Sequence, residues 1–210
     1  MPYRRRALWA LVILACVLLL IAPALWNGFA LLQYDTGGYL APWYEGRLEV
    51  NRPVPYGLLL VAGQRPDFWP VVIVQAALTV WLLALILRAH GLKDRPWLLF
   101  GTVATLCLFT TLPWLTAILL TDIFAGLGVL GLYLLLLRDD ALRRGERAGL
   151  MALTIYCAAV ESRCDAVALG TNISVAAPFV RRCLTGSTMA PFPHPPGHRR
   201  RSPASGSHGT

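Results

Sequence analysis

The sequence predicts an all-α membrane protein with about four transmembrane helices, one long external loop and a disordered C-terminal tail. Three observations support this fold class. Of the 210 residues, 56% are hydrophobic and only 14% are charged, whereas soluble domains contain about 25% charged residues. Several apolar runs approach the roughly 20 residues that a helix needs to cross a bilayer. The charged residues lie between these runs, as in the loops of polytopic proteins.

The basic excess of the chain does not indicate a nucleic-acid partner. The sequence has 19 Lys and Arg against 11 Asp and Glu, but these charges separate apolar runs instead of forming one basic face. We therefore expect the lipid bilayer as a partner and no nucleic acid. The five cysteines form no Cys-x-x-Cys pair and no cluster with histidine, so neither a disulfide framework nor a zinc site is predicted.

The first predicted span covers residues 7–26 and follows three arginines at positions 4–6. A cleavable signal peptide is the alternative, because Ala22-Pro23-Ala24 has the small-x-small form of a cleavage site. We favour an uncleaved helix, since a proline between the two alanines is a poor cleavage context and further apolar runs follow.

Three more spans and one short helix are expected after the first span. The spans are predicted at residues 69–87, 97–112 and 115–137. The external loop covers residues 27–68. Within it, residues 53–62 are apolar but short, which predicts an interfacial or re-entrant helix that starts near Pro55, where a proline costs little.

The apolar pattern ends within a fifth run, Ala148–Val160, which stops too early to span a bilayer. Residues 161–210 end in a mixture of Pro, Arg, Ser, Gly and His. A disordered tail fits this composition, and out-of-frame translation of GC-rich DNA is a second interpretation that also explains the abrupt change. We therefore expect a transmembrane domain over residues 1–160, followed by a disordered or frame-shifted tail.

Three arginine-rich clusters predict the orientation of the chain. One precedes the first span, one follows the second and one follows the fourth; their members are Arg4–Arg6, then Arg88, Lys93 and Arg95, then Arg138, Arg143, Arg144 and Arg147. Basic loops stay in the cytoplasm. A four-span topology therefore places the N-terminus and all three clusters inside, and the loop over residues 27–68 outside.

Two charged residues of the external loop are candidates for chemistry. Asp35 precedes Gly37-Gly38 and could act as a general base or hold a divalent cation; the alternative is an Asx-type turn. Arg52 precedes a stiff Pro-Val-Pro segment and could bind a phosphate through both arms of its guanidinium. Its alternative role is a charge that extends to the lipid headgroups.

Two tyrosines and one further aspartate complete the candidates. Tyr39 and Tyr56 could line a sugar-binding cleft, or they could belong to an aromatic belt at the membrane interface. Asp122 lies inside the predicted fourth span, where a carboxylate costs about 2.5–3.5 kcal/mol at the bilayer centre and less near its edge. If the turn around Pro113 re-enters, Asp122 faces the same compartment as Asp35. We treat it as a second carboxylate candidate, either functional or structurally paired.

Three motifs resemble those of a known family. They are Asn-Gly-Phe at residues 27–29 before Asp-Thr-Gly-Gly-Tyr at residues 35–39, Arg-Pro-Val-Pro-Tyr at residues 52–56, and Leu-Pro-Trp at residues 112–114 before Asp-Ile-Phe-Ala-Gly at residues 122–126. Together with the first span and the hydrophobic ladder, they resemble the GT-C superfamily of polytopic membrane glycosyltransferases, and in particular a related group of bacterial membrane proteins. The resemblance covers about residues 7–160.

This resemblance implies a location in the bacterial inner (cytoplasmic) membrane and a polyprenyl-phosphate-linked sugar as the donor. It implies Asp35 as the catalytic general base of an inverting transfer, with the metal unknown and a divalent cation left open. Arg52 would lie at the donor phosphate, and Tyr39 and Tyr56 are substrate-binding candidates from the residue argument above. Members of the superfamily have longer chains, so the resemblance implies an N-terminal fragment that we expect to be inactive. The alternative is a small non-catalytic membrane protein whose external loop binds a partner.

Overall fold

The computed structural model describes residues 2–46, 52–92 and 95–161 of the chain. Within these ranges the regular elements are all helical, which confirms the predicted all-α class. The elements, in chain order, are α1 (Pro2–Leu20), α2 (Ala22–Asn27), α3 (Thr36–Tyr44), α4 (Val54–Ala62), α5 (Trp69–Ala89), α6 (Pro96–Phe109), α7 (Leu112–Ala117), α8 (Asp122–Leu137), the 3₁₀ helix η1 (Asp139–Ala141) and α9 (Arg144–Glu161).

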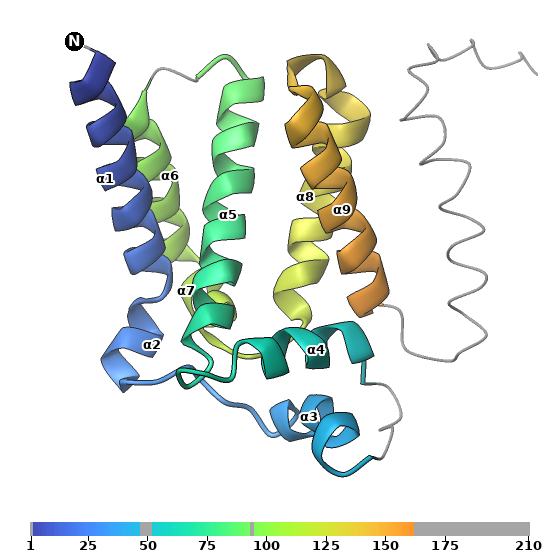
Figure 1. The fold of residues 1–210 in the computed structure, drawn as a ribbon. Helices are drawn as coiled ribbons and strands as arrows, with labels where there is room; N and C mark the ends of the chain where they lie inside the picture. Colours follow the sequence, from blue (N-terminus) through green and yellow to red (C-terminus); the bar gives the residue numbers. More distant parts are fainter. Residues whose placement is uncertain (1, 47–51, 93–94, 162–210) are drawn as a thin grey trace, which may run out of the picture.

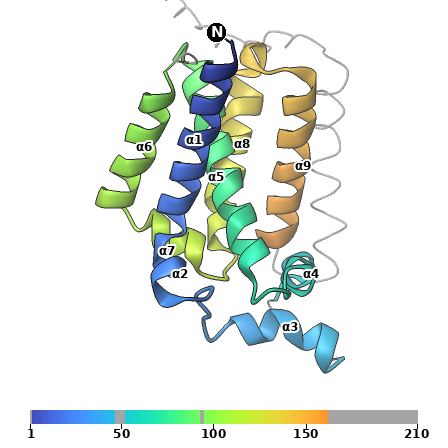
Figure 2. The ribbon, with the colours of Figure 1, turned by 60° about the vertical axis from the view of Figure 1, so that its left-hand side comes forward.

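The long helices form a bundle with α5 in the middle (Figure 1). α1 packs against α6, α8 packs against α9, and α5 contacts both α1 and α8. The short helices α3 and α4 lie across one end of this bundle, where α4 also contacts α9 (Figure 2). We call this end the α3–α4 end, and the end that holds the N-terminus the N-terminal end.

Among the described helices, α5 is the one that is both long and apolar enough to cross a membrane. It buries Val72, Ala76 and Val80, which are spaced at four residues and therefore share one face of the helix. The helices α6 and α8 are apolar but shorter. Helix length and composition thus identify one membrane-capable helix in the described part of the chain, where the sequence predicts about four spans.

The first and third predicted spans have different bounds in the structure. The run expected over residues 7–26 forms two helices, α1 and α2, that meet at Ile21. Pro23 follows the break, and a proline cannot donate the backbone hydrogen bond that would continue the helix. The run expected over residues 97–112 ends as a helix at Phe109, because Thr110 is extended.

The fourth predicted span, over residues 115–137, is wrong in its first third. Residues 115–117 belong to α7, the chain is then non-helical, and α8 begins only at Asp122. The reason is a competing set of hydrogen bonds. Leu31 forms an isolated parallel bridge with Ile118, and the Leu119 N–H donates to the Leu31 carbonyl over 3.0 Å. The backbone here bonds to a distant segment instead of continuing a helix.

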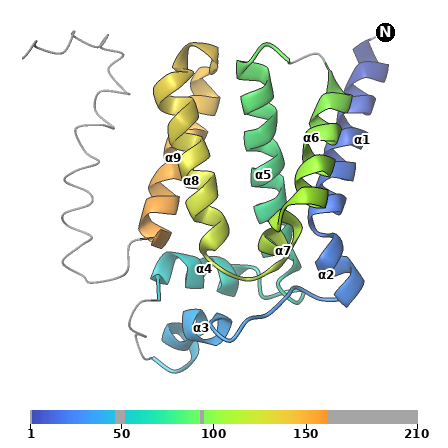
Figure 3. The same ribbon diagram turned by 180° about the vertical axis from the view of Figure 1, so that it is seen from behind.

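The fifth apolar run, which we predicted to be too short to span a bilayer, forms the apolar part of a longer helix. This helix, α9, begins at the polar Arg144 and runs beside α8 back to the α3–α4 end (Figure 3). Two glycines of α8 permit this close packing. A Cβ at Gly128 would lie 3.0 Å from the Cys157 Cβ, and one at Gly131 would lie 2.9 Å from the Thr154 Oγ1. The predicted tail from residue 162 onward lies outside the described residues.

The predicted external loop, residues 27–68, contains helices. The short helix expected near Pro55 is present as α4 and begins at Val54. The helix α3 was not predicted, because Gly37, Gly38 and Pro42 are poor helix formers. Its C-terminal half packs on α4 at Gly57, where a Cβ would lie only 2.3 Å from the Tyr39 carbonyl oxygen.

All three arginine-rich clusters lie at the N-terminal end, as far as the structure describes them. The start of α1, the α5–α6 connection and the α8–α9 connection meet there, opposite α3 and α4 (Figure 1); Lys93 lies outside the described residues. Arg88, in the last turn of α5, forms an ion pair with Glu146 near the start of α9. Arg88 also donates to the Ala141 carbonyl over 3.4 Å, so it joins α5 to the α8–α9 connection.

Candidate functional site

Two connecting segments place the candidate residues beside each other. The segment before α3 runs next to the segment before α8, where the Leu31 N–H donates to the Ala117 carbonyl over 3.0 Å. The Thr36 hydroxyl extends this contact by donating to the Leu119 carbonyl over 3.3 Å. Asp35, which directly precedes Thr36, and Asp122, which follows Leu119 by three residues, are thereby brought to the same end of the bundle.

A cavity of about 490 Å³ lies where these segments meet. It contains four of the five residues that we singled out from the sequence: Asp35, Tyr39, Arg52 and Asp122. Its full lining is Gln33, Asp35, Tyr39, Arg52, Pro53, Leu120, Thr121, Asp122, Val160 and Glu161. The structure therefore assembles one polar cavity from α3, the residues before α4, the start of α8 and the end of α9.

Two residues, Asp35 and Tyr39, hold Arg52 within this cavity. Its Nη2 forms a hydrogen-bonded ion pair with Asp35, and its guanidinium carbon lies 5.2 Å from the centre of the Tyr39 ring, a cation–π distance. The hydrogen bond with Asp35 raises the pKa of Arg52 above its ordinary value. The two side chains keep 26% and 35% of their surface exposed, so a ligand in the cavity can reach both.

Asp35 does not form the Asx-type turn that was its alternative role. It occupies the N-cap position of α3, but its side chain makes no capping hydrogen bond. The neighbouring Thr36 makes the local contact instead, because its hydroxyl accepts the Gln33 N–H over 3.0 Å. The Asp35 carboxylate is directed to Arg52, seventeen residues further along the chain.

Tyr56 lies behind the cavity and does not line it. Its side chain is fully buried, and its ring packs edge-on against Tyr39 at 5.0 Å and against Phe124 at 5.8 Å. Phe124 in turn contacts Tyr156 at 5.2 Å. The Gln75 amide donates to the Tyr56 hydroxyl over 3.5 Å. This aromatic row joins α3 and α4 to α8 and α9 and supports the cavity wall formed by Tyr39.

Two further carboxylates line the cavity opposite the ion pair. Asp122 is the first residue of α8, and Glu161 is the last residue of α9. Partial burial, together with repulsion from Asp122, raises the pKa of Glu161. We did not select Glu161 from the sequence, because the apolar run ends just before it. A helical period through the buried Cys157 places Glu161 on the same face of α9.

The described residues contain no group of three or more His, Cys, Asp or Glu side chains that could hold a metal ion. Asp35, Asp122 and Glu161 line one cavity, but they do not converge as a set of ligands. The divalent cation that the sequence left open therefore has no ligand set in this part of the chain.

A smaller cavity of about 210 Å³ adjoins the first one and shares Leu120 and Asp122 with it. Its other lining residues are Thr111, Trp114, Leu115 and Ile118. Asp122 thus stands between a polar space and a mostly apolar one. Such a pair of spaces suits a molecule with a polar head and an apolar tail.

Comparisons with known proteins add no relative. Neither a family model, nor a curated protein, nor a solved structure matches this chain.

Proposed function

We propose that the bundle lies in a membrane, with α1, α5, α6 and α8 as the four spans. The support comes from large apolar side chains that face outward on every bundle helix, such as Leu11, Ile73, Phe109, Val129 and Ile155. Soluble monomers rarely expose so much apolar surface. α9 would run back beside α8 as a fifth crossing helix, one more than the four spans that the sequence predicts, so that residue 161 would lie at the α3–α4 end (Figure 3).

We further propose that the N-terminal end is cytoplasmic and the α3–α4 end external. The arginine clusters at the N-terminal end support this orientation through the positive-inside rule. Exposed aromatic side chains at the other end suit the membrane–water interface, among them Trp26, Tyr34, Trp43 and Tyr44. The cavity that holds Asp35 would then open at the external surface of a bacterial inner membrane.

We propose that this cavity transfers a sugar from a polyprenyl-phosphate donor, as the GT-C resemblance implies. One observation carries the proposal. Asp35, Arg52 and Asp122 come from three separate segments, and all three line one cavity beside an apolar space. A donor of this class needs a cation for its phosphate, a carboxylate to accept a proton and room for a lipid chain.

The ion pair gives these residues an order of action. The donor phosphate would replace Asp35 as the partner of the Arg52 guanidinium, which favours bidentate contacts with phosphate. Asp35, released from Arg52, would accept the proton of the acceptor hydroxyl. The acceptor oxygen would then attack the anomeric carbon. The bond from that carbon to the phosphate oxygen would break, and the lipid phosphate would leave with the electron pair, held by Arg52.

Sugar release from a defined donor tests this proposal. The full chain would be reconstituted in lipid nanodiscs and given undecaprenyl-phosphate-linked glucose that carries a labelled sugar. The sequence alone predicts an inactive fragment. Because the described part of the chain already forms the cavity that holds Asp35, Arg52 and Asp122, we propose that it is active and expect labelled glucose to be transferred to water or to an added alcohol. Asp35→Asn should lower this rate by about 10²-fold or more, which is the usual contribution of a general base. Arg52→Gln should weaken donor binding as well.

Asp140→Asn is the matched control, because Asp140 is an exposed carboxylate in η1 at the opposite end of the bundle. This variant should release sugar at the rate of the unchanged protein. If the unchanged protein neither binds nor cleaves the donor, or if Asp35→Asn cleaves it at the original rate, the glycosyltransferase proposal is wrong.

A non-catalytic membrane protein is the second candidate, and the Asp35–Arg52 ion pair also favours it. The two charges neutralise each other, and the other charged groups lining the cavity, Asp122 and Glu161, are carboxylates. On this reading the pair fixes α3 to the segment before α4, and the exposed aromatic residues of α3 contact a partner protein. Donor binding separates the two candidates, because this second one requires none.

A further inference from the structure

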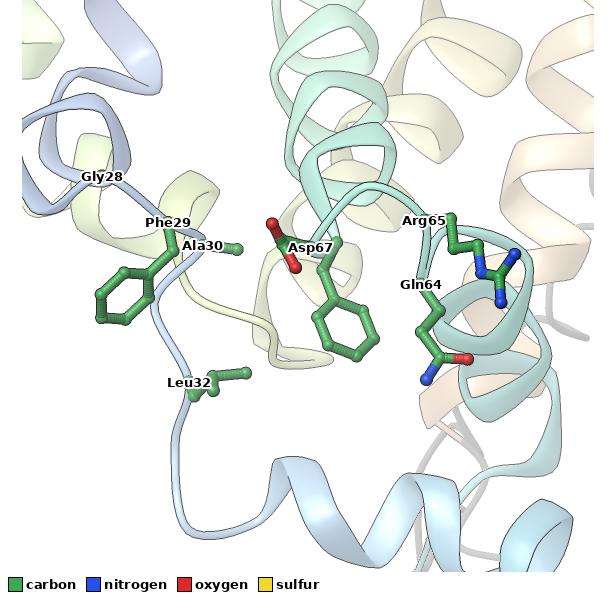
Figure 4. A pocket seen from close by; sticks show the side chains of 8 residues that line it. Gly28, Phe29, Ala30, Leu32, Gln64, Arg65 and Asp67 are labelled. Atoms are coloured by element: carbon green, nitrogen blue, oxygen red, sulfur yellow. The ribbon is translucent and has the colours of Figure 1, made fainter.

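A second and larger cavity, of about 690 Å³, lies at the α3–α4 end on the side of α2. It separates the segment before α3 from the turn that connects α4 to α5 (Figure 4). Gly28, Phe29, Ala30 and Leu32 line one side of it, and Gln64, Arg65, Asp67 and Phe68 line the other. It shares no lining residue with the cavity that holds Asp35.

This cavity combines one positive and one negative side chain. Neither Arg65 nor Asp67 forms an ion pair with another described residue. Figure 4 shows the Asp67 carboxylate turned toward Phe29 and Ala30, with the Arg65 guanidinium on the far side of the turn. The Arg65 guanidinium and the Asp67 carboxylate therefore lie apart, and both side chains are exposed to solvent (Figure 4). A ligand that carries a negative and a positive group could contact one of them with each group.

Two features of the turn fix these polar groups. Asp67 and Phe68 both have left-handed backbone angles, with φ of 43° and 62°, a conformation that non-glycine residues seldom adopt. It lets the chain reverse between α4 and α5 while Asp67 stays at the cavity. The Tyr44 hydroxyl donates to the Gln64 Oε1, so the amide N–H groups of Gln64 remain as donors beside Arg65.

Apolar side chains surround the same cavity. Phe29 and Leu32 keep half or more of their surface exposed, and Leu25 and Trp26 of the neighbouring α2 are exposed as well. At a membrane surface, such side chains contact the glycerol region and the upper acyl chains. The cavity thus offers a charged base and an apolar rim.

We infer that this cavity binds the headgroup of a phosphatidylethanolamine lipid. The Arg65 guanidinium and the Gln64 amide would donate to the lipid phosphate, and the primary ammonium would donate to the Asp67 carboxylate. Phe29, Leu32 and Phe68 would contact the start of the acyl chains. A primary ammonium carries three N–H donors and a quaternary one has none, so the site should prefer ethanolamine to choline headgroups. This inference rests on the proposed membrane location of the bundle, but it does not depend on the proposed glycosyl transfer.

Lipid retention by the full chain tests the inference. The purified protein, in detergent micelles, would be mixed with equal amounts of dioleoyl phosphatidylethanolamine, phosphatidylcholine and phosphatidylglycerol, and the bound lipid would be counted by native mass spectrometry. We expect selective retention of phosphatidylethanolamine. Asp67→Asn and Arg65→Gln should each lower its occupancy by about tenfold, which corresponds to the loss of one charge-assisted hydrogen bond.

Asp67→Asn should keep the fold, because asparagine tolerates the left-handed conformation better than most residues. Asp140→Asn is the control and should retain the lipid as the unchanged protein does.

Equal retention of the three lipids, or full retention by Asp67→Asn and Arg65→Gln, would overturn the inference. Competition by soluble glycerophosphoethanolamine at the lipid's own concentration would also overturn it, since the apolar rim would then contribute nothing. Donor cleavage by Asp67→Asn should be unchanged, which separates this result from the test of the transferase.

Discussion

Arg52 lies directly against Gly38: a Cβ at position 38 would stand 2.9 Å from the Arg52 Nε atom and 3.3 Å from its Cγ and Cδ atoms. The missing side chain leaves the space through which Arg52 passes to reach Asp35 and the Tyr39 ring. Of the two neighbouring glycines, Gly38 is therefore the one whose lack of a side chain the structure requires. Nothing lies within 4 Å of a Cβ built at Gly37.

Gly38→Ala and Gly37→Ala should therefore differ in stability although they are neighbours in α3. Alanine stabilises a helix by about 0.5–1 kcal/mol relative to glycine, and Gly37→Ala should show this gain. In Gly38→Ala the new methyl group displaces Arg52. Losing the partly exposed ion pair costs up to about 1 kcal/mol, so the gain is cancelled. Unfolding of the purified protein by titration with denaturing detergent measures the difference.

Equal stabilisation by both substitutions would show that Arg52 moves aside at no cost, contrary to this account. Asp35→Asn provides the matching background. With the ion pair already removed, Gly38→Ala should recover most of the gain that Gly37→Ala shows, because little remains for the methyl group to disrupt.

Thr116 joins the end of α1 to α7 through one buried hydroxyl. Its Oγ1 lies 2.8 Å from the Leu20 carbonyl oxygen and 3.0 Å from those of Leu112 and Pro113. Thr116→Val keeps the shape of the side chain and removes the hydroxyl, so we expect a loss of about 1 kcal/mol in the free energy of unfolding.

Thr102→Val is the control for this prediction. Thr102 also donates to a backbone carbonyl four residues earlier, but it is only partly buried on α6, and its hydroxyl bonds to no other described helix. Its substitution should change the free energy of unfolding by less than about 0.5 kcal/mol. A Thr116→Val protein as stable as the Thr102→Val protein would mean that the contact between α1 and α7 contributes nothing.

The candidate residues of the main cavity could be selected from the sequence, because each is a charged or aromatic residue in an apolar setting. Asp35, Arg52 and Asp122 stand out for this reason, and the structure brings all three into one cavity. Tyr56 stood out by the same reasoning but is buried behind Tyr39, since an aromatic ring serves a core as well as a surface.

The parts that could not be predicted depend on contacts between distant segments. Residues 118–121 are mostly apolar, so the sequence predicts them as part of a span. In the structure the bridge between Leu31 and Ile118 uses the backbone hydrogen bonds here, and the segment is not helical. Likewise, the close packing of α9 along α8 depends on the glycines of α8 that α9 contacts. Apolar periodicity describes a helix by itself and contains no information about which distant backbone will compete for its hydrogen bonds.

The Arg88–Glu146 ion pair at the N-terminal end makes the stability of the protein depend on pH. Hydrogen bonds from Arg88, and from the Arg143 N–H over 2.9 Å, hold the pKa of Glu146 below its ordinary value. The folded protein therefore binds this proton less tightly than the unfolded chain does. The stabilisation is fully present above the ordinary pKa of glutamate and is lost as the pH falls through the lower pKa of the folded state.

Glu146→Gln should remove this acid-sensitive part of the stability, which we expect to be about 1 kcal/mol because both side chains remain partly exposed. Glu161→Gln is the contrasting variant. The pKa of Glu161 is raised, so its contribution has the opposite sign and stability falls as the pH rises through the window between the two pKa values. Thermal unfolding midpoints from about pH 3 to pH 7 measure both slopes. If Glu146→Gln keeps the acid-side slope of the unchanged protein, a different carboxylate controls the acid sensitivity of the bundle.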